Sequence, residues 1–460
     1  MEKQTIYEKP VRAKTMLAFT LPSVVLMVFT SMYTVVDGIV VSNFVGSLGL
    51  SAINIVFPLQ NLNVAASVML ATGSNAVIGR MLGEGRGREA NAFMSVTTVV
   101  TLVLATVLAA VFLILDEPLY YMLGSDDLLL PYCVDYGKIV IPGSILMSME
   151  FLCHSYLVTA DRPHLALALT IGGGVVNVVL DVVLVGVLDL GVAGAAAASV
   201  AGQFLTGLAP FLLFFRKSML IHFTRPSASL REFLFAMGNG ASEMVDTLAA
   251  ALTTTLYNLQ LMHLVGEKGV AAFSAVLYLD FIFVAVSAGY TQGIAPVVSF
   301  HFGAGNRQNL QKLLRLSLCV CGVFSAATFL LAEFFNRPLV MIFASEDPQL
   351  ASLMISGFRL LALKFLCSGL VIFTSGFFTA LNNGRVSAFL SVIRTFVLEV
   401  GCLLLLPAVM GISGVWLALP ISESVTVVIS VLLLVKYRRR YGYFGDPLPD
   451  PPEDSAVDPS

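Results

Sequence analysis

Four polar side chains stand out from apolar stretches in the first half of the chain. Asn177 and Asp181 are four residues apart and share one helix face, while Asp37 and Ser199 lie in other apolar segments. Carboxylate, amide and hydroxyl oxygens are hard ligands that suit Na⁺. Two nearby carboxylates in a low dielectric can instead hold one proton, because they resist joint ionisation. Asp37, Asn177, Asp181 and Ser199 are therefore predicted to bind one cation, H⁺ or Na⁺.

The second half carries a different polar set. Glu243 and Asp246 are three residues apart on one helix face, and Arg394 lies at a similar depth in another apolar segment, where it is placed to neutralise Glu243. Inward-facing acids favour cationic substrates, whereas ion pairing within the protein is the alternative. Further charges within apolar segments are Glu150, Asp280, Lys364, Glu399 and Glu423.

The remaining chemistry-bearing residues predict no other site. His154 and His263 are isolated, and no spacing typical of His and Cys metal ligands occurs, so we expect no bound metal other than Na⁺ and no cofactor. The glycine-rich sequence from Gly83 to Gly87 lacks the lysine and the strand–helix context of a phosphate-binding loop. It is interpreted as a turn.

The elements that position these residues must cross a membrane. Of the 460 residues, 57% are hydrophobic and 12% are charged, about half the charged share of a globular protein. The hydrophobic residues are numerous enough for about twelve spans of roughly 22 residues. We therefore expect an all-α polytopic membrane protein with twelve transmembrane helices. The predicted spans are 15–41, 51–79, 92–115, 133–158, 164–188, 190–215, 233–262, 270–299, 311–335, 352–380, 386–409 and 411–435.

The basic residues predict the orientation. With the N-terminus inside, twenty of the 26 Lys and Arg fall on the cytoplasmic side and two on the other. Both termini are then cytoplasmic, and the chain is expected in the cytoplasmic membrane, which is the inner membrane of a cell that has two. The net charge of −3 with no basic face excludes a nucleic-acid partner.

The chain repeats itself at a shift of 220 residues. Val45-Gly46 matches Val265-Gly266, and Gly191 and Gly194 match Gly411 and Gly414. Six spans in each copy make a parallel repeat, the plan of a transporter with a central cavity. The positions equivalent to the four polar residues of the first half are Tyr257, Val397, Gly401 and Leu419. The cation site is thus predicted in one half only.

The predicted organisation follows from the repeat. A cytoplasmic segment, 1–14, precedes a six-helix bundle at 15–215, a cytoplasmic linker at 216–232, a second bundle at 233–435 and a tail at 436–460, expected to be disordered because of its Pro and Asp content. No break is long enough for a nucleotide-binding domain. We expect neither ATP hydrolysis within the chain nor an ATPase subunit.

Several motifs resemble the multidrug and toxic compound extrusion (MATE) family. They are Tyr33-Thr-Val-Val-Asp37, Leu82-Gly-Glu-Gly85, Asn177-Val-Val-Leu-Asp181 with Gly191-Val-Ala-Gly-Ala195, and Gly411-Ile-Ser-Gly-Val-Trp416. The resemblance implies an antiporter that exports amphipathic, often cationic, compounds in exchange for inward H⁺ or Na⁺. It also implies that Asp37, Asn177, Asp181 and Ser199 form the cation site. The chain departs from some branches by having Arg359 and Lys364, not a carboxylate, in the tenth span.

Two other functions are weighed against export. A flippase of anionic lipid-linked oligosaccharides or lipids would line its cavity with several Arg or Lys, and only Arg359, Lys364 and Arg394 qualify here. A membrane-embedded enzyme or sensor would need a nucleophile, a metal set or an output domain, and none is visible. We expect a monomeric transporter of small organic molecules in the lipid bilayer, not an enzyme.

Overall fold

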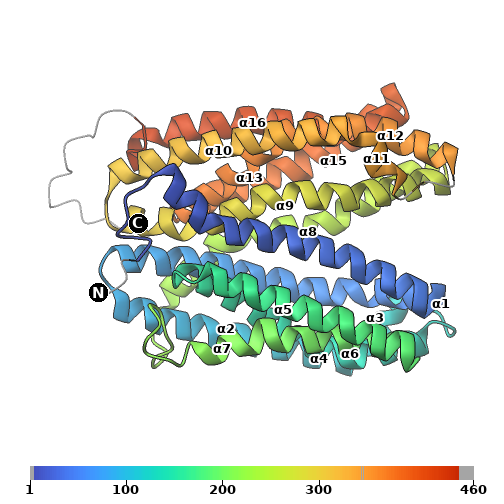
Figure 1. Ribbon diagram of the computed structural model, residues 1–460, viewed down its shortest axis with the longest axis horizontal. Helices are drawn as coiled ribbons and strands as arrows, with labels where there is room; N and C mark the ends of the chain where they lie inside the picture. The colour runs from blue at the N-terminus through green and yellow to red at the C-terminus, as the bar shows by residue number, and fades with distance from the viewer. Residues whose placement is uncertain (1–4, 343, 345–346, 445–460) are drawn as a thin grey trace.

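The computed structural model describes residues 5–342, 344 and 347–444, without the side chains of 34–43, 46 and 47. Across these residues the structure is helical, and the long helices run along one common axis (Figure 1). The first half comprises α1 (Ala13–Gly83), α2 (Gly87–Ile114), α3 (Asp116–Met122), α4 (Leu130–Thr159), α5 (Pro163–Asp181), η1 (Val182–Val187), α6 (Gly191–Gln203), η2 (Phe204–Leu208) and α7 (Ala209–Leu213). The second half comprises α8 (Leu230–Leu264), α9 (Glu267–Gly303), α10 (Arg307–Phe334), α11 (Asn336–Met341), α12 (Pro348–Ala362), α13 (Phe365–Ala380), α14 (Gly384–Val392), η3 (Ile393–Glu399), α15 (Val400–Met410) and α16 (Ile412–Tyr441).

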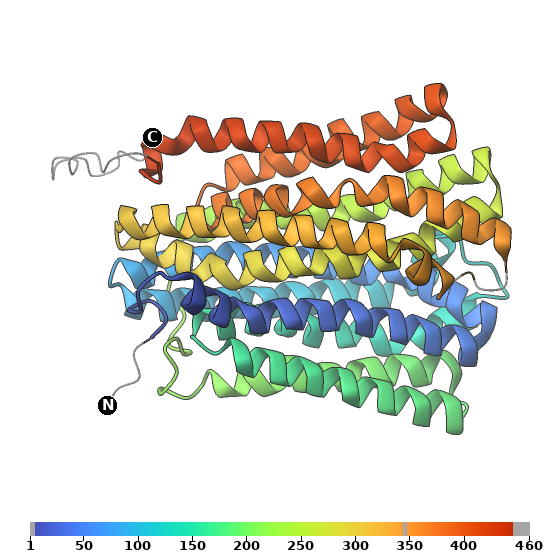
Figure 2. The ribbon, with the colours of Figure 1, turned by 45° about the horizontal axis from the view of Figure 1, so that its top comes forward.

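Helix α1 supplies the first two predicted spans. It runs over 71 residues and folds back on itself, so that its dark-blue start and lighter-blue end lie along the same bundle (Figure 2). Both ends pack on the last turns of α9: Ser23 contacts Gly293, and Arg80 contacts Gly303. The side chain of Asp37, in the first half of α1, lies outside the described residues.

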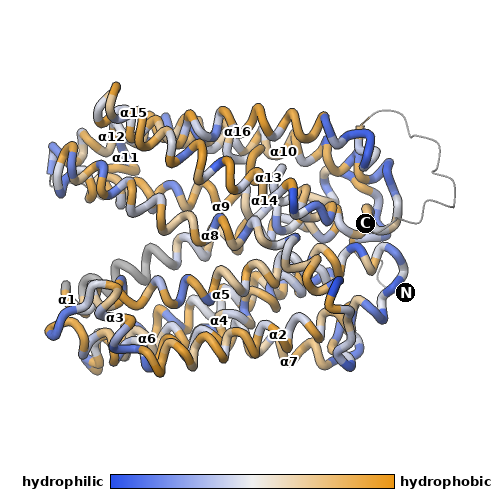
Figure 3. Tube along the Cα trace, turned by 180° about the vertical axis from the view of Figure 1, so that it is seen from behind, coloured by the Kyte–Doolittle hydropathy of each residue, from blue (hydrophilic) through white to orange (hydrophobic). Residues whose placement is uncertain are grey.

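The helices are long and apolar enough to cross a bilayer. Among the described residues ten helical segments meet this test, and α12 with α13, bent by 50°, form an eleventh. Helix α8 has 35 residues and packs on α1, α9 and α14. It is less apolar because it carries groups such as Glu243 and Asp246. With α8 added, the membrane-spanning helices are consistent with the predicted twelve. Figure 3 shows hydrophobic residues along the length of the helices and hydrophilic residues gathered at their ends.

Glycines bring the two halves into close contact at the end that carries both termini. A Cβ atom on Gly83 of α1 would lie 2.0 Å from the carbonyl oxygen of Phe300 in α9. One on Gly240 of α8 would lie 1.9 Å from the carbonyl oxygen of Met69 in α1. Small residues allow such backbone approach between membrane helices, which gain packing contacts in return.

The tail is ordered further than expected. Helix α16 continues to Tyr441, and Tyr443 is fully buried with its hydroxyl donating to the carbonyl oxygen of Leu434 at 3.0 Å. The ordered chain thus extends past the predicted boundary at 435. The remainder of the predicted tail, 445–460, lies outside the described residues.

Charges buried in the second half are paired across helices. Lys364, in the break between α12 and α13, places Nζ 2.7 Å from Oδ2 of Asp280 in α9, and both side chains are below 10% exposed. Arg394 of η3 donates from Nε and Nη2 to Oε1 of Glu423 in α16, at 2.9 and 2.6 Å. The structure thus pairs the Arg394 guanidinium with a fully buried carboxylate on a neighbouring helix, and neutralisation of Glu243 by Arg394 stays a prediction.

Removing the cation of the Asp280–Lys364 pair should destabilise the fold. Lys364→Met leaves a buried carboxylate without its partner, at a cost of about 3–5 kcal/mol, and should lower the melting temperature in detergent markedly. Arg359→Gln is the control, since Arg359 pairs with Glu333 but is 71% exposed, and exposed pairs contribute at most about 1 kcal/mol. Equal melting temperatures for the two variants would contradict a structural role for the buried pair.

Candidate functional site

A cavity of about 400 Å³ lies between the two halves. Helices α1, α4, α5, α6 and η2 contribute its walls from the first half, and α8, α9 and α13 from the second. Most of the lining is apolar or small. The lining side chains that carry a carboxylate, an amide or an imidazole are Asn75, Glu150, His154, Gln203, Glu243 and Gln292.

The structure brings two of the predicted first-half residues, Asn177 and Ser199, into direct contact. The amide of Asn177 in α5 donates to Oγ of Ser199 in α6 at 3.3 Å, and Ser199 also lines the cavity. This contact forms because Gly173 and Gly202 let the two helices approach: a Cβ on Gly202 would lie 2.8 Å from the Gly173 carbonyl oxygen.

Asn177 and Asp181 face the interior of the first half. They are 1% and 0% exposed, respectively. Oδ1 of Asn177 is buried and accepts no hydrogen bond from a described residue, so an oxygen ligand remains available beside Ser199. The contribution of Asp37 stays a prediction.

The three second-half candidates have different surroundings in the structure. Glu243 lines the cavity and is half-buried. Asp246, one turn further along α8, accepts a hydrogen bond at Oδ2 from the Ser391 hydroxyl at 3.0 Å, and Arg394 is bound to Glu423. Of the three predicted residues, Glu243 is therefore the one positioned to contact a molecule in the cavity.

Two cavity residues were not assigned to a site from the sequence. Glu150 and His154 are four apart on α4 and line the same wall. Their spacing of four residues, which puts both on one helix face, is the feature of the sequence that could have identified them as a pair. Nε2 of His154 and Oε1 of Gln203 are buried without a described hydrogen-bond partner, so both can serve a ligand.

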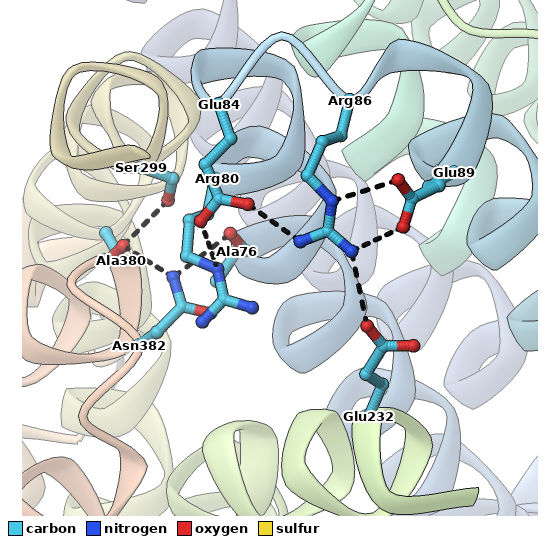
Figure 4. A network of polar contacts seen from close by, with 9 residues as sticks. All are labelled: Ala76, Arg80, Glu84, Arg86, Glu89, Glu232, Ser299, Ala380 and Asn382. Carbon is cyan, nitrogen blue, oxygen red and sulfur yellow. Dashed lines mark hydrogen bonds and ion pairs between the residues drawn. The ribbon is translucent and has the colours of Figure 1, made fainter. Parts of the chain in front are cut away.

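A polar network forms the floor of the cavity at the end that carries the termini (Figure 4). Ser299 of α9 lines the cavity and donates its hydroxyl to the Ala380 carbonyl oxygen at 2.9 Å. Asn382 donates to the Ala76 carbonyl oxygen at 3.2 Å and so joins the two halves.

Arg86 extends this network. It binds Glu84 at 2.8 Å, Glu89 of α2, and Glu232 of α8 at 3.5 Å, which is a second link between the halves. Below the cavity the two halves are thus held by hydrogen bonds, ion pairs and glycine contacts together.

No metal centre of the usual kind is formed by the described residues, where no group of three or more His, Cys, Asp or Glu side chains is positioned to hold a metal ion. The amide and hydroxyl oxygens of Asn177 and Ser199 are ligands of the kind that Na⁺ binds, together with carboxylates. They could equally form hydrogen bonds with a protonated carboxyl group.

Comparisons with known proteins agree with the fold and the repeat. The family model MatE matches residues 22–183 and again 244–403. The last residues of the two segments, 183 and 403, are 220 residues apart, and their first residues, 22 and 244, are 222 apart, close to the register read from the sequence. Among curated proteins, the chain is 23% identical over 447 residues to the multidrug export protein MepA of Staphylococcus haemolyticus, covering 95% of this chain and 97% of that protein. It is 25% identical over 421 residues to the FAD transporter of Shewanella oneidensis, covering 89% and 91%.

Solved structures show the same architecture. A crystal structure of MATE in complex with MaL6 superposes with a TM-score of 0.89 at 20% identity, covering 95% of this chain and 99% of that one. An outward-facing multidrug resistance MATE family transporter superposes with a TM-score of 0.86 at 22% identity, covering 96% and 100%. The chain, with its two matched repeats and a cavity between them, belongs to the MatE family of multidrug and toxic compound extrusion transporters.

Proposed function

We propose that this transporter exports amphipathic organic cations in exchange for inward H⁺ or Na⁺. The observation that carries the proposal is the charge of the cavity. Glu150 from the first half and Glu243 from the second line it, and the described lining contains no Lys or Arg. Carboxylates in a mostly apolar cavity attract cations with apolar bodies, because desolvation strengthens the electrostatic interaction.

The same observation weighs against anionic substrates. A flippase of anionic headgroups needs basic side chains around its cargo, and Arg359, Lys364 and Arg394 do not line the cavity. One relative is named an FAD transporter, and FAD is anionic because it carries a pyrophosphate. The acidic cavity of this chain is unsuited to such a substrate. The relative named as a multidrug exporter supports the export of drugs.

Coupling is proposed at Asp37, Asn177, Asp181 and Ser199. Ser199 belongs both to this cluster and to the cavity wall, so an ion bound there changes the charge and packing next to the substrate. An ion drives a conformational change only if it binds the two states with different free energies. Alternating access through rocking of the two halves supplies such states.

The chain is proposed to act as a monomer, without an ATPase subunit, with the end that carries both termini in the cytoplasm. The excess of Lys and Arg at that end supports this orientation. The network of Asn382 and Arg86 then closes the cytoplasmic side. Opening toward the cytoplasm requires these contacts and the Gly83 contact to separate.

Neutralising the cavity acids should weaken cation transport. We expect Glu150→Gln and Glu243→Gln each to raise the KM for a monovalent organic cation about tenfold, the loss of one charge-assisted contact, without a similar change for a neutral substrate. Uptake into inverted vesicles measures this, with Glu267→Gln, an exposed acid outside the cavity, as the matched control. Unchanged KM values in both cavity variants would rule out a cationic site.

Neutralising the two acids of the proposed ion site, Asp37 and Asp181, should uncouple substrate transport from ion movement. In proteoliposomes with Na⁺ and pH varied independently, the wild type should move H⁺ or Na⁺ against substrate. Asp37→Asn and Asp181→Asn should abolish this ion movement but retain substrate binding. Asp189→Asn, an exposed loop acid, serves as the control. Normal coupling in both variants would move the ion site elsewhere.

Enlarging Gly83 should hold the cytoplasmic side open. Gly83→Val adds a Cβ that would meet the Phe300 backbone, so Ser299→Cys should react faster with a water-soluble maleimide in this background. Gly322→Val is the control, because nothing lies within 4 Å of its added Cβ. An unaltered labelling rate would show that the glycine contact does not keep that side closed.

A further inference from the structure

A second cavity, of about 490 Å³, lies at the end of the molecule that carries both termini. It is formed by the N-terminal segment before α1, the start of α1, the turn between α4 and α5, and the segment that follows α7. It shares no lining residue with the central cavity. The two cavities come near each other at the α4–α5 turn, where Ala160 lines the second cavity and Val158 and Ala166 line the central one.

The N-terminal segment is held in place as one wall of this cavity. The hydroxyl of Tyr7 donates to the Thr159 carbonyl oxygen at 2.6 Å, and its ring stacks on Phe300 with centroids 4.5 Å apart. Burial, and then the nearby Asp161, raise the pKa of Tyr7, which keeps this hydroxyl a donor. The backbone N–H of Ile6 donates to Oδ2 of Asp161 at 3.2 Å. The wall is therefore built by specific contacts on α4 and α9.

The lining of this cavity is suited to an anion. Lys9, Arg162 and His164 lie on it, and none of them forms an ion pair with a described residue. Helix α5 begins at Pro163, so the positive end of a 19-residue helix adds to the same field. Asp161 is the acid on the lining, and it accepts the Ile6 N–H.

Two rows of exposed apolar side chains lead from this cavity along the helices. On α1 the row is Ala18, Leu21 and Val25, and on α5 it is Ala168, Ile171 and Val175. Their spacing of three or four residues puts each row on one helix face. The two helices meet further along, where a Cβ on Gly174 would lie 2.8 Å from the Phe29 ring, and α5 runs beside the first part of α1 (Figure 2).

We propose that this cavity binds the phosphate headgroup of an anionic phospholipid, whose acyl chains lie along the seam between α1 and α5. Lys9 and Arg162 contact the phosphate, and His164 and the start of α5 complete the site. A phospholipid accounts for the basic cavity and the adjoining apolar rows together, whereas a soluble phosphate compound would use the cavity alone.

The position of the seam gives this lipid a consequence for the transporter. Tyr33 of α1 and Gly174 of α5 line the central cavity, and Gly174 is also where the two helices touch. A lipid seated along the seam packs against the outer side of this wall. It should therefore stabilise the first half of the protein in the arrangement that holds the wall closed.

Lipid binding to the purified full-length chain tests the proposal. Dissociation constants are measured in neutral detergent by native mass spectrometry for phosphatidylglycerol and for phosphatidylcholine with the same acyl chains, and thermal stabilisation is measured alongside. The double variant K9Q/R162Q should bind phosphatidylglycerol about 30-fold more weakly, which at 1.4 kcal/mol per factor of ten equals about 2 kcal/mol for two basic residues. Its melting temperature without lipid should match that of the wild type, because neither residue forms an ion pair with a described residue.

The matched control is R438Q/R439Q, which removes two exposed arginines at the end of α16, away from the cavity. It should keep the wild-type affinity for phosphatidylglycerol. Equal loss in both double variants would show general surface attraction and overturn the proposal, as would wild-type affinity in K9Q/R162Q. Glycerol phosphate or inorganic phosphate should not stabilise the protein at the lipid concentration. If either one does so as well as the lipid, the site binds soluble phosphate and the proposal of a lipid site fails.

Discussion

The cost of placing charge inside a membrane governs this structure. A charged side chain near mid-membrane costs about 2.5–3.5 kcal/mol on insertion scales, so each one needs a partner or a function. The second half meets this cost with pairs between helices, Lys364 with Asp280 and Arg394 with Glu423. Glu150 and Glu243 belong to neither pair and line the central cavity, where the proposed substrate cation would supply an opposite charge.

Close packing between the halves depends on the absence of side chains. Gly83 and Gly240 let α1 meet α9 and α8 at backbone distance, and the hydrogen bonds of Ser299 and Asn382 surround that contact. These interactions are small and numerous, so they can separate without breaking a buried charge pair. Such an arrangement suits a contact that must open in every transport cycle, whereas the buried pairs lie within one half and need not be broken.

The proposed ion site and the wall of the central cavity share a helix in the first half. Ser199 on α6 accepts a hydrogen bond from Asn177 and lines the cavity. The repeat comparison had already set this cluster apart, because the equivalent positions in the second half are apolar or aromatic. The two halves thus share a fold but differ in chemistry at these positions, while both contribute residues to the cavity.

The sequence by itself determined the class of protein, the helices and the repeat, because apolar length and the 220-residue register are properties of the chain alone. It also predicted Asn177 and Ser199 in one cluster, because both are polar residues within apolar segments of the first half. The glycine contact that lets their helices touch was found only in the structure. The sequence could not determine which charges pair. Arg394 binds Glu423, 29 residues further along the chain, and not Glu243, because the side chain that a guanidinium meets depends on how the helices pack. Nor did it show that Glu150 and His154 face the cavity. The direction in which a helix face points depends on how twelve helices pack, and only the tertiary structure decides that.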